Sequence, residues 1–358
     1  MLASRGVSAT LNAWMALALS PVASSTTTGV THFHRSCDPH HIDARQNAAT
    51  ISGHMKAAVY TKTKSGKLLE LKDLEQPVPK DNEVVLRVRA ASVNPLDWRM
   101  KSRRPGVDVA GEVVAVGRTV TQFKPGDAVF GAGKGAFAEY ACAPEAKLAL
   151  KPEKVSSEQA AAVPIAGLTA LQGLRDKGCL QPGQKVLING AAGGIGTFAV
   201  QIAKSFGANV TGVCSTKNVE LVRSLGADRV IDYTREDFTQ GSERYDLLLD
   251  NVGNRALSAM KRVLTPPGKC VIAGAPKKMS AVFTWVLKIF ARSLLLRENF
   301  KFFIASINRD DLTTFCRLIE AGKVIPVIDR EYALTQTADA IAYAEEGHAR
   351  AKVLITMS

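Results

Sequence analysis

The spacing of apolar residues changes part-way along the chain. From residue 55 to residue 152, short apolar runs of strand length are separated by turns such as 124–127, which reads K-P-G-D. From residue 185 to about residue 275, apolar strands alternate with helical patterns, as in a parallel sheet built from strand–helix–strand units. The pattern predicts a β-rich domain followed by an α/β domain with a doubly wound parallel sheet.

Each half is expected to contain five strands before the chain turns back. In the β-rich half these are 56–60, 83–91, 110–116, 128–130 and 136–143, and in the α/β half they are 186–189, 210–213, 229–231, 247–250 and 270–273. A helix at 157–161 leads into an apolar helix at 163–174, which crosses into the α/β half. The remaining elements are a helix at 310–322, a strand at 325–332, a helix at 338–346 and a strand at 352–356. We expect them to rejoin the β-rich domain.

This organisation predicts two domains and an N-terminal extension. The β-rich domain is expected to span 55–168 and to be completed by 305–358, and the α/β domain is expected to span 169–304. The first 54 residues contain two acidic residues and five of the six histidines. A transit-like presequence, a poor signal peptide and non-native upstream sequence are three interpretations of this extension, and we favour a start at Met55 and a cytoplasmic protein.

A glycine-rich turn follows the first predicted strand of the α/β half. The sequence K-V-L-I-N-G-A-A-G-G-I-G ends just before a helical pattern at 197–206. Glycines at this spacing allow a tight turn, close approach of the backbone to a pyrophosphate and packing of helix on strand. The helix N-terminus offers free N–H groups to the phosphates. The residues predicted to bind a dinucleotide here are Gly190, Ala192, Gly193, Gly194, Ile195 and Gly196.

The end of the next strand bears on which dinucleotide binds. NAD-preferring sites usually place an acidic residue there for the ribose 2′-hydroxyl, but 214–218 contains none. It contains Ser215 and Lys217, which suit a 2′-phosphate, and Tyr233 at the following strand end is expected along the adenosine. We therefore predict NADPH; the alternative is a solvated loop whose lysine is incidental.

Charge and cysteine content narrow the partners. The formal net charge is +13, but Lys and Arg residues are dispersed and no nucleic-acid-binding module is recognisable. A polyanionic small ligand explains this balance better than nucleic acid does. The six cysteines form no C-x-x-C pair, which fits a reducing compartment.

Several motifs together carry a family resemblance. They are A-S-V-N-P-L-D-W at 91–98, G-V-D-V-A-G-E-V at 106–113, K-P-G-D-A-V-F-G at 124–131, P-I-A-G-L-T-A at 164–170, the glycine-rich turn and D-N-V-G-N at 250–254. Over residues 55–358 the chain resembles the zinc-independent medium-chain dehydrogenases/reductases, on the quinone oxidoreductase branch. The resemblance implies a GroES-like catalytic domain, a Rossmann cofactor domain and a homodimer formed through an edge strand near 301–304.

The resemblance also implies the chemistry. Zinc-dependent relatives carry G-H-E where this chain has Gly106, Val107 and Asp108, and after Met55 the only histidine is His348. A catalytic zinc needs about three protein ligands, so we expect a metal-free site. Hydride transfer to a quinone or an α,β-unsaturated carbonyl fits, because the product anion is delocalised.

Candidate residues around the reacting atoms come from the same resemblance. Asn94 and Asp97 match positions on the substrate side, with Asn94 as the expected donor to an oxyanion, and Thr169 matches a position near the nicotinamide ribose. Turn formation is the alternative role for Asn94 and Asp97, and helix packing for Thr169. The nicotinamide is expected beside Asn251, Gly253 and Gly274.

Two segments depart from an ordinary member of this family. The connection at 99–105 is shorter than usual, which puts an inherited substrate in doubt and supports an alternative: an NADPH-binding assembly protein with little turnover. The segment 281–304 is strongly apolar with basic residues. It could dock a reductase of lipophilic substrates on an anionic membrane surface; we favour a core helix followed by the edge strand.

Overall fold

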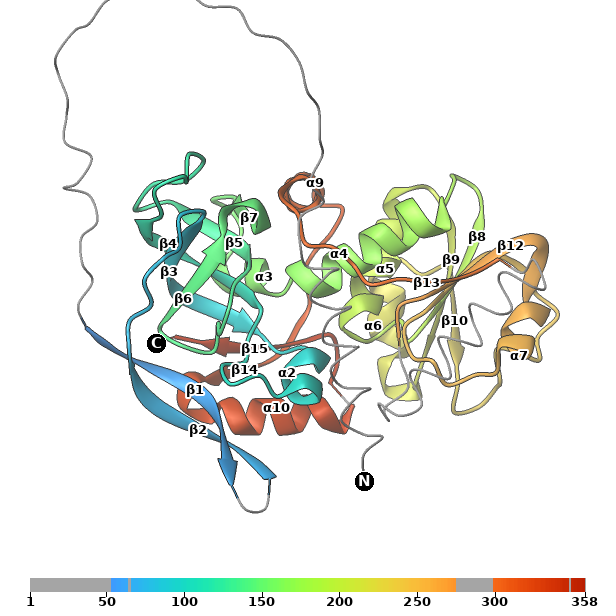
Figure 1. The fold of residues 1–358 in the computed structure, drawn as a ribbon. Helices are drawn as coiled ribbons and strands as arrows, with labels where there is room; N and C mark the ends of the chain where they lie inside the picture. Colours follow the sequence, from blue (N-terminus) through green and yellow to red (C-terminus); the bar gives the residue numbers. More distant parts are fainter. Residues whose placement is uncertain (1–52, 64–65, 275–298, 348, 358) are drawn as a thin grey trace, which may run out of the picture. The chain divides into compact units, whose positions relative to one another are not determined.

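The computed structural model describes residues 53–63, 66–274, 299–347 and 349–357. Their strands form a two-stranded, a six-stranded and a seven-stranded sheet (Figure 1). Most of the predicted extension at 1–54 and of the segment 281–304 lies outside the described residues. No helix of the described residues is long and apolar enough to cross a membrane.

The seven-stranded sheet contains the β-rich half of the sequence. Its strand order is β14-β15-β3-β4-β5-β7, with β6 paired to β3. Its strands are β3 (Glu83–Ser92), β4 (Asp108–Val116), β5 (Ala128–Ala132), β6 (Tyr140–Pro144), β7 (Leu148–Leu150), β14 (Ile328–Ala333) and β15 (Lys352–Thr356). The central strand, β3, is buried along most of its length, and only Arg87 and Arg89, in its middle, are exposed.

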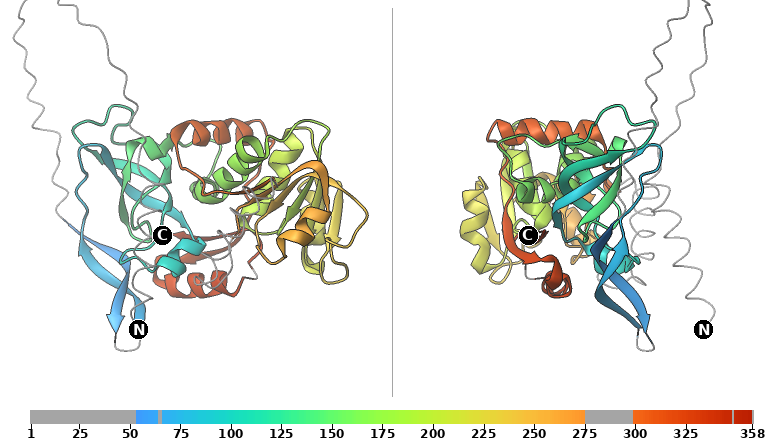
Figure 2. Two further views of the ribbon diagram at one scale, coloured as in Figure 1. Left: turned by 45° about the vertical axis from the view of Figure 1, so that its right-hand side comes forward. Right: turned by 90° about the vertical axis from the view of Figure 1, so that its left-hand side faces the viewer.

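The end of the chain joins this sheet. β15 runs antiparallel to β3, with Leu354 opposite Ser92, and β14 runs parallel to β15 (Figure 2). The helix α10 (Thr337–Glu346) connects β14 to β15 and contacts both of them. The last strand of the chain therefore lies beside β3, the strand that leads into Asn94. The predicted domain boundaries themselves stay a prediction.

The six-stranded sheet is entirely parallel and has the order β10-β9-β8-β11-β12-β13. Its strands are β8 (Lys185–Asn189), β9 (Asn209–Cys214), β10 (Arg229–Asp232), β11 (Tyr245–Asp250), β12 (Leu264–Ile272) and β13 (Phe300–Phe302). In order along the chain these are strands 3-2-1-4-5-6, the doubly wound Rossmann order. Four of these strands match their predicted ranges closely; β12 begins at Leu264 rather than at residue 270, and β13, at the end of the strand order among the described residues, lies close to the strand expected near 301–304.

Strand order reverses between β8 and β11, and this places the ligand crevice. In open α/β sheets, ligands bind beyond the carboxyl ends of the strands at such a switch point. The helices of this half are α5 (Gly194–Ser205), α6 (Val219–Ser224) and α7 (Leu257–Arg262). The predicted fold class, a GroES-like β-rich domain with a Rossmann domain, is confirmed.

The helices between the two larger sheets share one apolar core with both. α3 (Ser157–Ala161) is followed by α4 (Pro164–Gln172), which continues as a π-helical turn at Gly173–Gly178, and α9 (Arg309–Glu320) packs against α4. The rings of Phe198 in α5 and Phe315 in α9 pack edge to face, and their centroids are 5.4 Å apart. The core cluster includes Phe130 of the β-rich sheet, Leu168 of α4 and Val186 of the parallel sheet.

Two strands, β2 (Gly66–Glu75) and β7, and two α-helices, α2 (Pro95–Met100) and α7, were not predicted. β1 (His54–Thr63) pairs antiparallel with β2, whose many charged residues obscure the strand pattern. The short helices α2 and α7 each have only six residues, too few to show helical periodicity. β6 begins at Tyr140 rather than at residue 136, because Ala138 makes only an isolated bridge to Ala57.

Candidate active site

The glycine-rich turn lies at the carboxyl end of β8, at the strand-order switch point. Gly190 has a φ of +78°, which only glycine adopts without strain. A Cβ on Gly196 would collide with the carbonyl oxygen of Gly190, so the first turn of α5 lies directly on the turn's backbone. A Cβ on Gly193 would find only the Gly190 oxygen, at 3.4 Å. Gly190 and Gly196 are therefore required by the fold, whereas Gly193 leaves open space on its outer side.

The N-terminus of α5 presents unpaired backbone donors. Thr197 N–H donates to the Gly193 carbonyl at 3.0 Å, and Gly193 N–H donates to Gly190. The N–H groups of Ile195 and Gly196 have no acceptor among the described residues, whereas Gly194 N–H takes part in the parallel bridge between Gly193 and Ala351. Free N–H groups and the positive end of the helix dipole bind anions such as a pyrophosphate. The turn therefore fits the dinucleotide that the sequence predicts.

A buried carboxylate organises the neighbouring strand end. Asp250, the last residue of β11, is fully buried and accepts hydrogen bonds from Asn189 Nδ2 at 2.8 Å and from the N–H groups of Val252 and Gly253. These bonds hold the turn after β11 against the end of β8. The sequence analysis missed Asp250 and Asn189 as site-forming residues, although both lie in the quoted motifs.

This turn places two of the predicted nicotinamide-side residues. Asn251 Nδ2 donates to the Asn189 carbonyl at 3.1 Å, while Asn251 Oδ1 is buried without a hydrogen-bond partner among the described residues. A buried acceptor without a donor costs free energy unless a ligand supplies one. Gly274 lies so close to the Asn251 backbone that a Cβ would collide with it. Asn251, Gly253 and Gly274 thus surround one end of the crevice.

The end of β9 carries the residues predicted to select the cofactor. Lys217 is exposed and no carboxylate pairs with it among the described residues. Tyr233 is 55% exposed, and its N–H donates to the Cys214 carbonyl, so it stands beside the end of β9. Ser215 Oγ accepts from Asn218 Nδ2 at 3.1 Å.

The structure adds an acidic residue that the sequence window excluded. Asp232 ends β10 opposite Cys214, and its carboxylate accepts hydrogen bonds from Thr216 Oγ1 at 2.6 Å and from Thr234. The Arg235 guanidinium lies 3.5 Å away. These hydrogen bonds lower the pKa of Asp232, so the carboxylate is ionised but already engaged.

On the substrate side, Asn94 is fully hydrogen-bonded. Its Nδ2 donates to Asp108 Oδ2 at 2.8 Å and to the Ser92 carbonyl at 3.1 Å, and its Oδ1 accepts from Lys352 Nζ at 2.8 Å. The predicted role as a donor to an oxyanion requires one of these bonds to be exchanged. That role stays a prediction.

Asp97 closes the short connection after α2. Its carboxylate accepts from Asn94 N–H at 2.8 Å and from Gly106 N–H at 2.9 Å, so it ties the two ends of the 99–105 segment together. Burial raises the pKa of Asp97 to about 7, against the opposing effect of the two N–H donors. The observed contacts are those of turn formation, and contact with a substrate stays a prediction.

Two further charged residues, both missed by sequence reasoning, are buried in this region. Asp108 Oδ1 accepts from Ile165 N–H at 3.0 Å, and Asp108 Oδ2 lies 3.7 Å from Lys352 Nζ. Burial raises the pKa of Asp108 and lowers that of Lys352, while the attraction between the two charges opposes both shifts. The signal available in the sequence was a charged residue at the start of an apolar strand: Asp108 in β4 and Lys352 in β15.

Thr169 lies one turn beyond Ile165 in α4. Its Oγ1 donates to the Ile165 carbonyl at 2.6 Å, and its side chain is nearly buried. This bond occupies the hydroxyl hydrogen and leaves the oxygen able to accept one from a ligand. Ala166, on the same helix, lies next to Gly194 of the cofactor turn.

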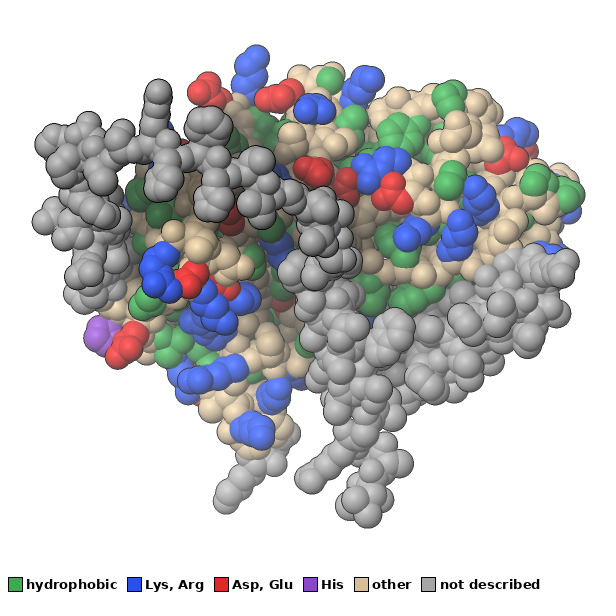
Figure 3. Space-filling view, turned by 45° about the horizontal axis from the view of Figure 1, so that its top comes forward, with side chains coloured by type: hydrophobic (Ala, Val, Ile, Leu, Met, Phe, Trp, Pro, Cys, Tyr) green, Lys and Arg blue, Asp and Glu red, His purple; other side chains and the backbone are tan. Residues whose placement is uncertain are grey.

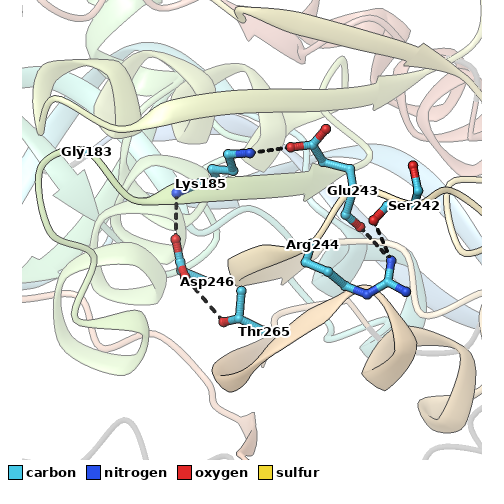
Figure 4. Close-up of a pocket in the computed structure, with 7 residues that line it drawn as sticks. All are labelled: Gly183, Lys185, Ser242, Glu243, Arg244, Asp246 and Thr265. Carbon is cyan, nitrogen blue, oxygen red and sulfur yellow. Dashed lines mark hydrogen bonds and ion pairs between the residues drawn. The ribbon is translucent and has the colours of Figure 1, made fainter.

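A surface hollow lies elsewhere on the parallel-sheet half. It has a volume of about 580 Å³ and is lined by residues at the amino ends of β8, β11 and β12 (Figure 4). Its polar groups satisfy one another: Lys185 pairs with Glu243, Asp246 accepts from Lys185 N–H and Thr265, and Arg244 donates to backbone carbonyls. This hollow lies at the amino ends of the strands, whereas the glycine-rich turn follows the carboxyl end of β8, so the two are separate places on the sheet.

Surface charge and metal ligands give no competing site. On the face shown in Figure 3, basic side chains lie among acidic ones, and pairs such as Arg118–Asp81 and Arg87–Glu112 neutralise part of the excess charge. Within the ranges that the structure describes, no three His, Cys, Asp or Glu side chains are grouped as metal ligands.

Comparison with known proteins identifies the family. Residues 80–153 match the model described as alcohol dehydrogenase GroES-like domain, and residues 225–355 match the one described as zinc-binding dehydrogenase. The chloroplast envelope quinone oxidoreductase homolog of Arabidopsis thaliana is 34% identical over 80% of this chain and 93% of its own length. The chain belongs to the medium-chain dehydrogenase/reductase superfamily, on its quinone oxidoreductase branch.

Other members support this placement. The mitochondrial NAD(P)H oxidoreductase RTN4IP1 of Mus musculus is 35% identical over 77% of this chain and 82% of its own length. The solved quinone oxidoreductase from Coxiella burnetii superposes with a TM-score of 0.75 at 28% identity, covering 86% of this chain and all of its own. As a member of this superfamily, the protein is an oxidoreductase that uses a nicotinamide cofactor.

Two glycine substitutions separate folding from ligand contact. Gly196→Ala should lower the free energy of unfolding by about 2 kcal/mol or more and weaken NADPH binding, because its Cβ collides with backbone. Gly193→Ala should keep the free energy of unfolding within about 1 kcal/mol of wild type but weaken NADPH binding at least about tenfold, because the Cβ occupies the ligand's side. Denaturant unfolding and cofactor fluorescence titration measure both effects. Unchanged NADPH affinity of Gly193→Ala would contradict this assignment.

The buried Asp97 predicts a pH dependence of stability. Its folded-state pKa of about 7 exceeds the ordinary value of 3.8, so the folded protein binds the extra proton between these pH values. Stability from this group is therefore present at low pH and lost as pH rises through 7. The stability advantage of wild type over Asp97→Asn should shrink by about 2–3 kcal/mol between pH 5 and pH 8 in denaturant unfolding. The exposed Asp81, substituted by Asn, is the control and should give a constant difference; a constant difference for Asp97→Asn would refute the prediction.

Proposed function

We propose that the protein is an NADPH-dependent reductase of quinones or α,β-unsaturated carbonyl compounds. The observation that carries the proposal is the pair of N–H groups at Ile195 and Gly196, which have no acceptor among the described residues and lie directly beyond the glycine-rich turn at the strand-order switch point. The names of relatives support the substrate class. Among them is an NADPH-dependent alkenal/one oxidoreductase, chloroplastic, from Arabidopsis thaliana, 34% identical over 86% of this chain and 81% of its own length.

The chemistry asks little of the protein's side chains. A bound NADPH supplies a hydride equivalent and becomes NADP⁺. An enone substrate would gain a C–H bond at the β-carbon while its π electrons move to the carbonyl oxygen, and a proton from water would complete the reduction at the α-carbon. A quinone would accept the hydride equivalent and one proton from water, and would leave as a quinol with two O–H groups. The enolate or quinol anion is delocalised, so hydrogen bonds suffice to stabilise it.

The residues of this chain contribute binding and orientation. The first turn of α5 would hold the pyrophosphate, and Thr169 Oγ1 is free to accept a hydrogen bond from the ribose. Asn251, with its unpaired buried Oδ1, would accept from the nicotinamide carboxamide. Asn94 and Asp97 would shape the substrate side through the hydrogen bonds that fix α2.

Two features at the ends of β9 and β10 support NADPH rather than NADH as the cofactor. Lys217 is an exposed cation without an acidic partner among the described residues, at the strand end where the 2′-position would lie. Asp232, the acidic residue nearest by strand register, is already bound by Thr216 and Thr234. It is therefore poorly placed to accept from a ribose 2′-hydroxyl, and Lys217 is left to pair with a 2′-phosphate.

A charge removal tests this preference. Lys217→Ala should weaken NADPH binding by about tenfold and leave NADH binding unchanged, because one charge-assisted contact to the 2′-phosphate is lost. Lys124→Ala, which removes an exposed lysine from a turn of the β-rich sheet, should change neither. Isothermal titration of both cofactors measures the effect, and equal losses for NADPH and NADH would show that Lys217 does not contact the 2′-phosphate.

Turnover tests the reductase itself. Purified protein should oxidise NADPH, seen as loss of its near-ultraviolet absorbance, in the presence of quinones or enones and much more slowly without them. The competing hypothesis is an NADPH-binding assembly protein, favoured by the short 99–105 connection that Asp97 closes through Gly106. NADPH binding with no turnover on either substrate class would reject the reductase and support that alternative.

Compartment and oligomeric state complete the proposal. We propose a cytoplasmic protein, and relatives named for chloroplasts or mitochondria support an organelle as the alternative. N-terminal sequencing of the native protein separates these outcomes. Among the described residues β13 is the last strand of the six-stranded sheet, and the homodimer that the family resemblance implies near 301–304 stays a prediction. Membrane contact through 281–304 rests mainly on residues outside those that the structure describes.

A further inference from the structure

Lys352, the first residue of β15, is a buried lysine whose position the proposed reaction does not explain. Only 3% of it is exposed. Its Nζ lies 2.8 Å from Asn94 Oδ1, 3.4 Å from the Val93 carbonyl and 3.7 Å from Asp108 Oδ2. A buried ion pair of this kind stabilises a fold no better than apolar residues of similar volume. Its presence therefore calls for a role other than stability.

The partners of Lys352 lead to the substrate side and to α4. Asp108 receives Asn94 Nδ2 on one oxygen and Ile165 N–H, in the first turn of α4, on the other. Ile165 in turn accepts the hydroxyl of Thr169. One charged pair thus holds the strand end at Asn94 and the helix that carries Thr169 in a fixed relation.

The backbone next to Lys352 leads to the cofactor turn. Ala351 has a φ of +71°, an uncommon conformation for alanine, and its N–H donates to the Ala192 carbonyl at 2.9 Å. The aliphatic part of Lys352 passes Gly194 so closely that a Cβ there would lie 3.2 Å from Lys352 Cδ. The Ala351 backbone and the aliphatic part of the Lys352 side chain therefore contact the glycine-rich turn, and the Lys352 ammonium group contacts the substrate side at Asn94.

We propose that Lys352 is a positioning residue for hydride transfer, which sets the geometry between the cofactor turn and the substrate-side groups Asn94 and Thr169. This inference rests on the proposed reductase function. Lys352 touches neither cofactor nor substrate; it acts through Asn94, Asp108 and Gly194. A displacement of about 1 Å between reacting groups can cost about a hundredfold in rate. Loss of Lys352 should therefore slow hydride transfer more than it weakens cofactor binding.

The test compares substitutions of two lysines that contact opposite ends of β3. Lys352 contacts Asn94, just beyond the last residue of the strand, and Lys134 contacts Glu83, its first residue. Lys352→Met removes the ammonium group and keeps the stem's length. Lys134→Met is the matched control, because Lys134 Nζ pairs at 2.6 Å with the buried Glu83, the first residue of β3, far from the glycine turn. Single-turnover rates with NADPH and 4-deuterated NADPH, the NADPH dissociation constant and the melting temperature are measured for each.

The expected results distinguish positioning from stability. Lys352→Met should lower the single-turnover rate by about thirtyfold or more with a fully expressed deuterium isotope effect, while the NADPH dissociation constant changes less than about threefold. Lys134→Met should change the rate less than about threefold, whatever its effect on melting temperature. A folded Lys352→Met protein with a near-normal rate would overturn the inference.

A double variant covers the case in which Lys352→Met leaves Asp108 unpaired and fails to fold. Asp108→Asn with Lys352→Met removes both charges and should recover the melting temperature, as neutral replacements of buried ion pairs often do. The inference predicts that its rate stays low. Recovery of both stability and rate would mean that only charge balance matters, and would overturn it. A wild-type protein without turnover would reject the proposed reductase and this inference together, whereas an active wild type isolates the inference.

Discussion

Close packing of α5 on the end of β8 is the constraint on which the rest of the structure depends. Because a side chain at Gly196 would collide with the carbonyl of Gly190, the helix begins directly on the turn. The N–H groups of Ile195 and Gly196 in its first turn consequently have no acceptor among the described residues. That geometry favours an anionic ligand at the switch point of the sheet. The glycines at 190 and 196 thus serve the fold and the ligand at once.

A second constraint is the need to satisfy charges buried between the two sheets. Asp108, Asp97 and Lys352 are all at most 4% exposed, and each is surrounded by hydrogen-bond partners from other segments. Burying a charge without such partners would be costly. The partners come from β3, β4, α2, α4 and β15, so the network fixes these elements relative to one another. The same requirement places Asp250 between the turns after β8 and β11.

Much of the fold could be predicted from local sequence. The parallel strands β8, β9 and β11 are short apolar runs followed by turn residues, and the helix at 157–161 has the predicted bounds because Ser156 caps it through Gln159. β2 was missed because its strand conformation comes from pairing with β1 rather than from alternation. Local pattern therefore predicted elements whose own residues decide their structure.

The site was only partly predictable for a related reason. The glycine-rich turn and Lys217 follow two successive strands of the sequence, so the distance between them along the chain is enough to predict their roles. Lys352 and Asp108 are separated by more than two hundred residues, and only the pairing of β15 with β3 and of β3 with β4 brings them together. Asp232 was likewise overlooked, because strand register and not sequence distance places it beside Thr216.

The most direct test of the account is a crystal structure of the protein with NADP⁺ bound. The account predicts that the pyrophosphate oxygens lie within hydrogen-bonding distance of the N–H groups of Ile195 and Gly196, with the 2′-phosphate beside Lys217. A dinucleotide bound away from the N-terminus of α5, or a 2′-phosphate facing away from Lys217, would contradict it.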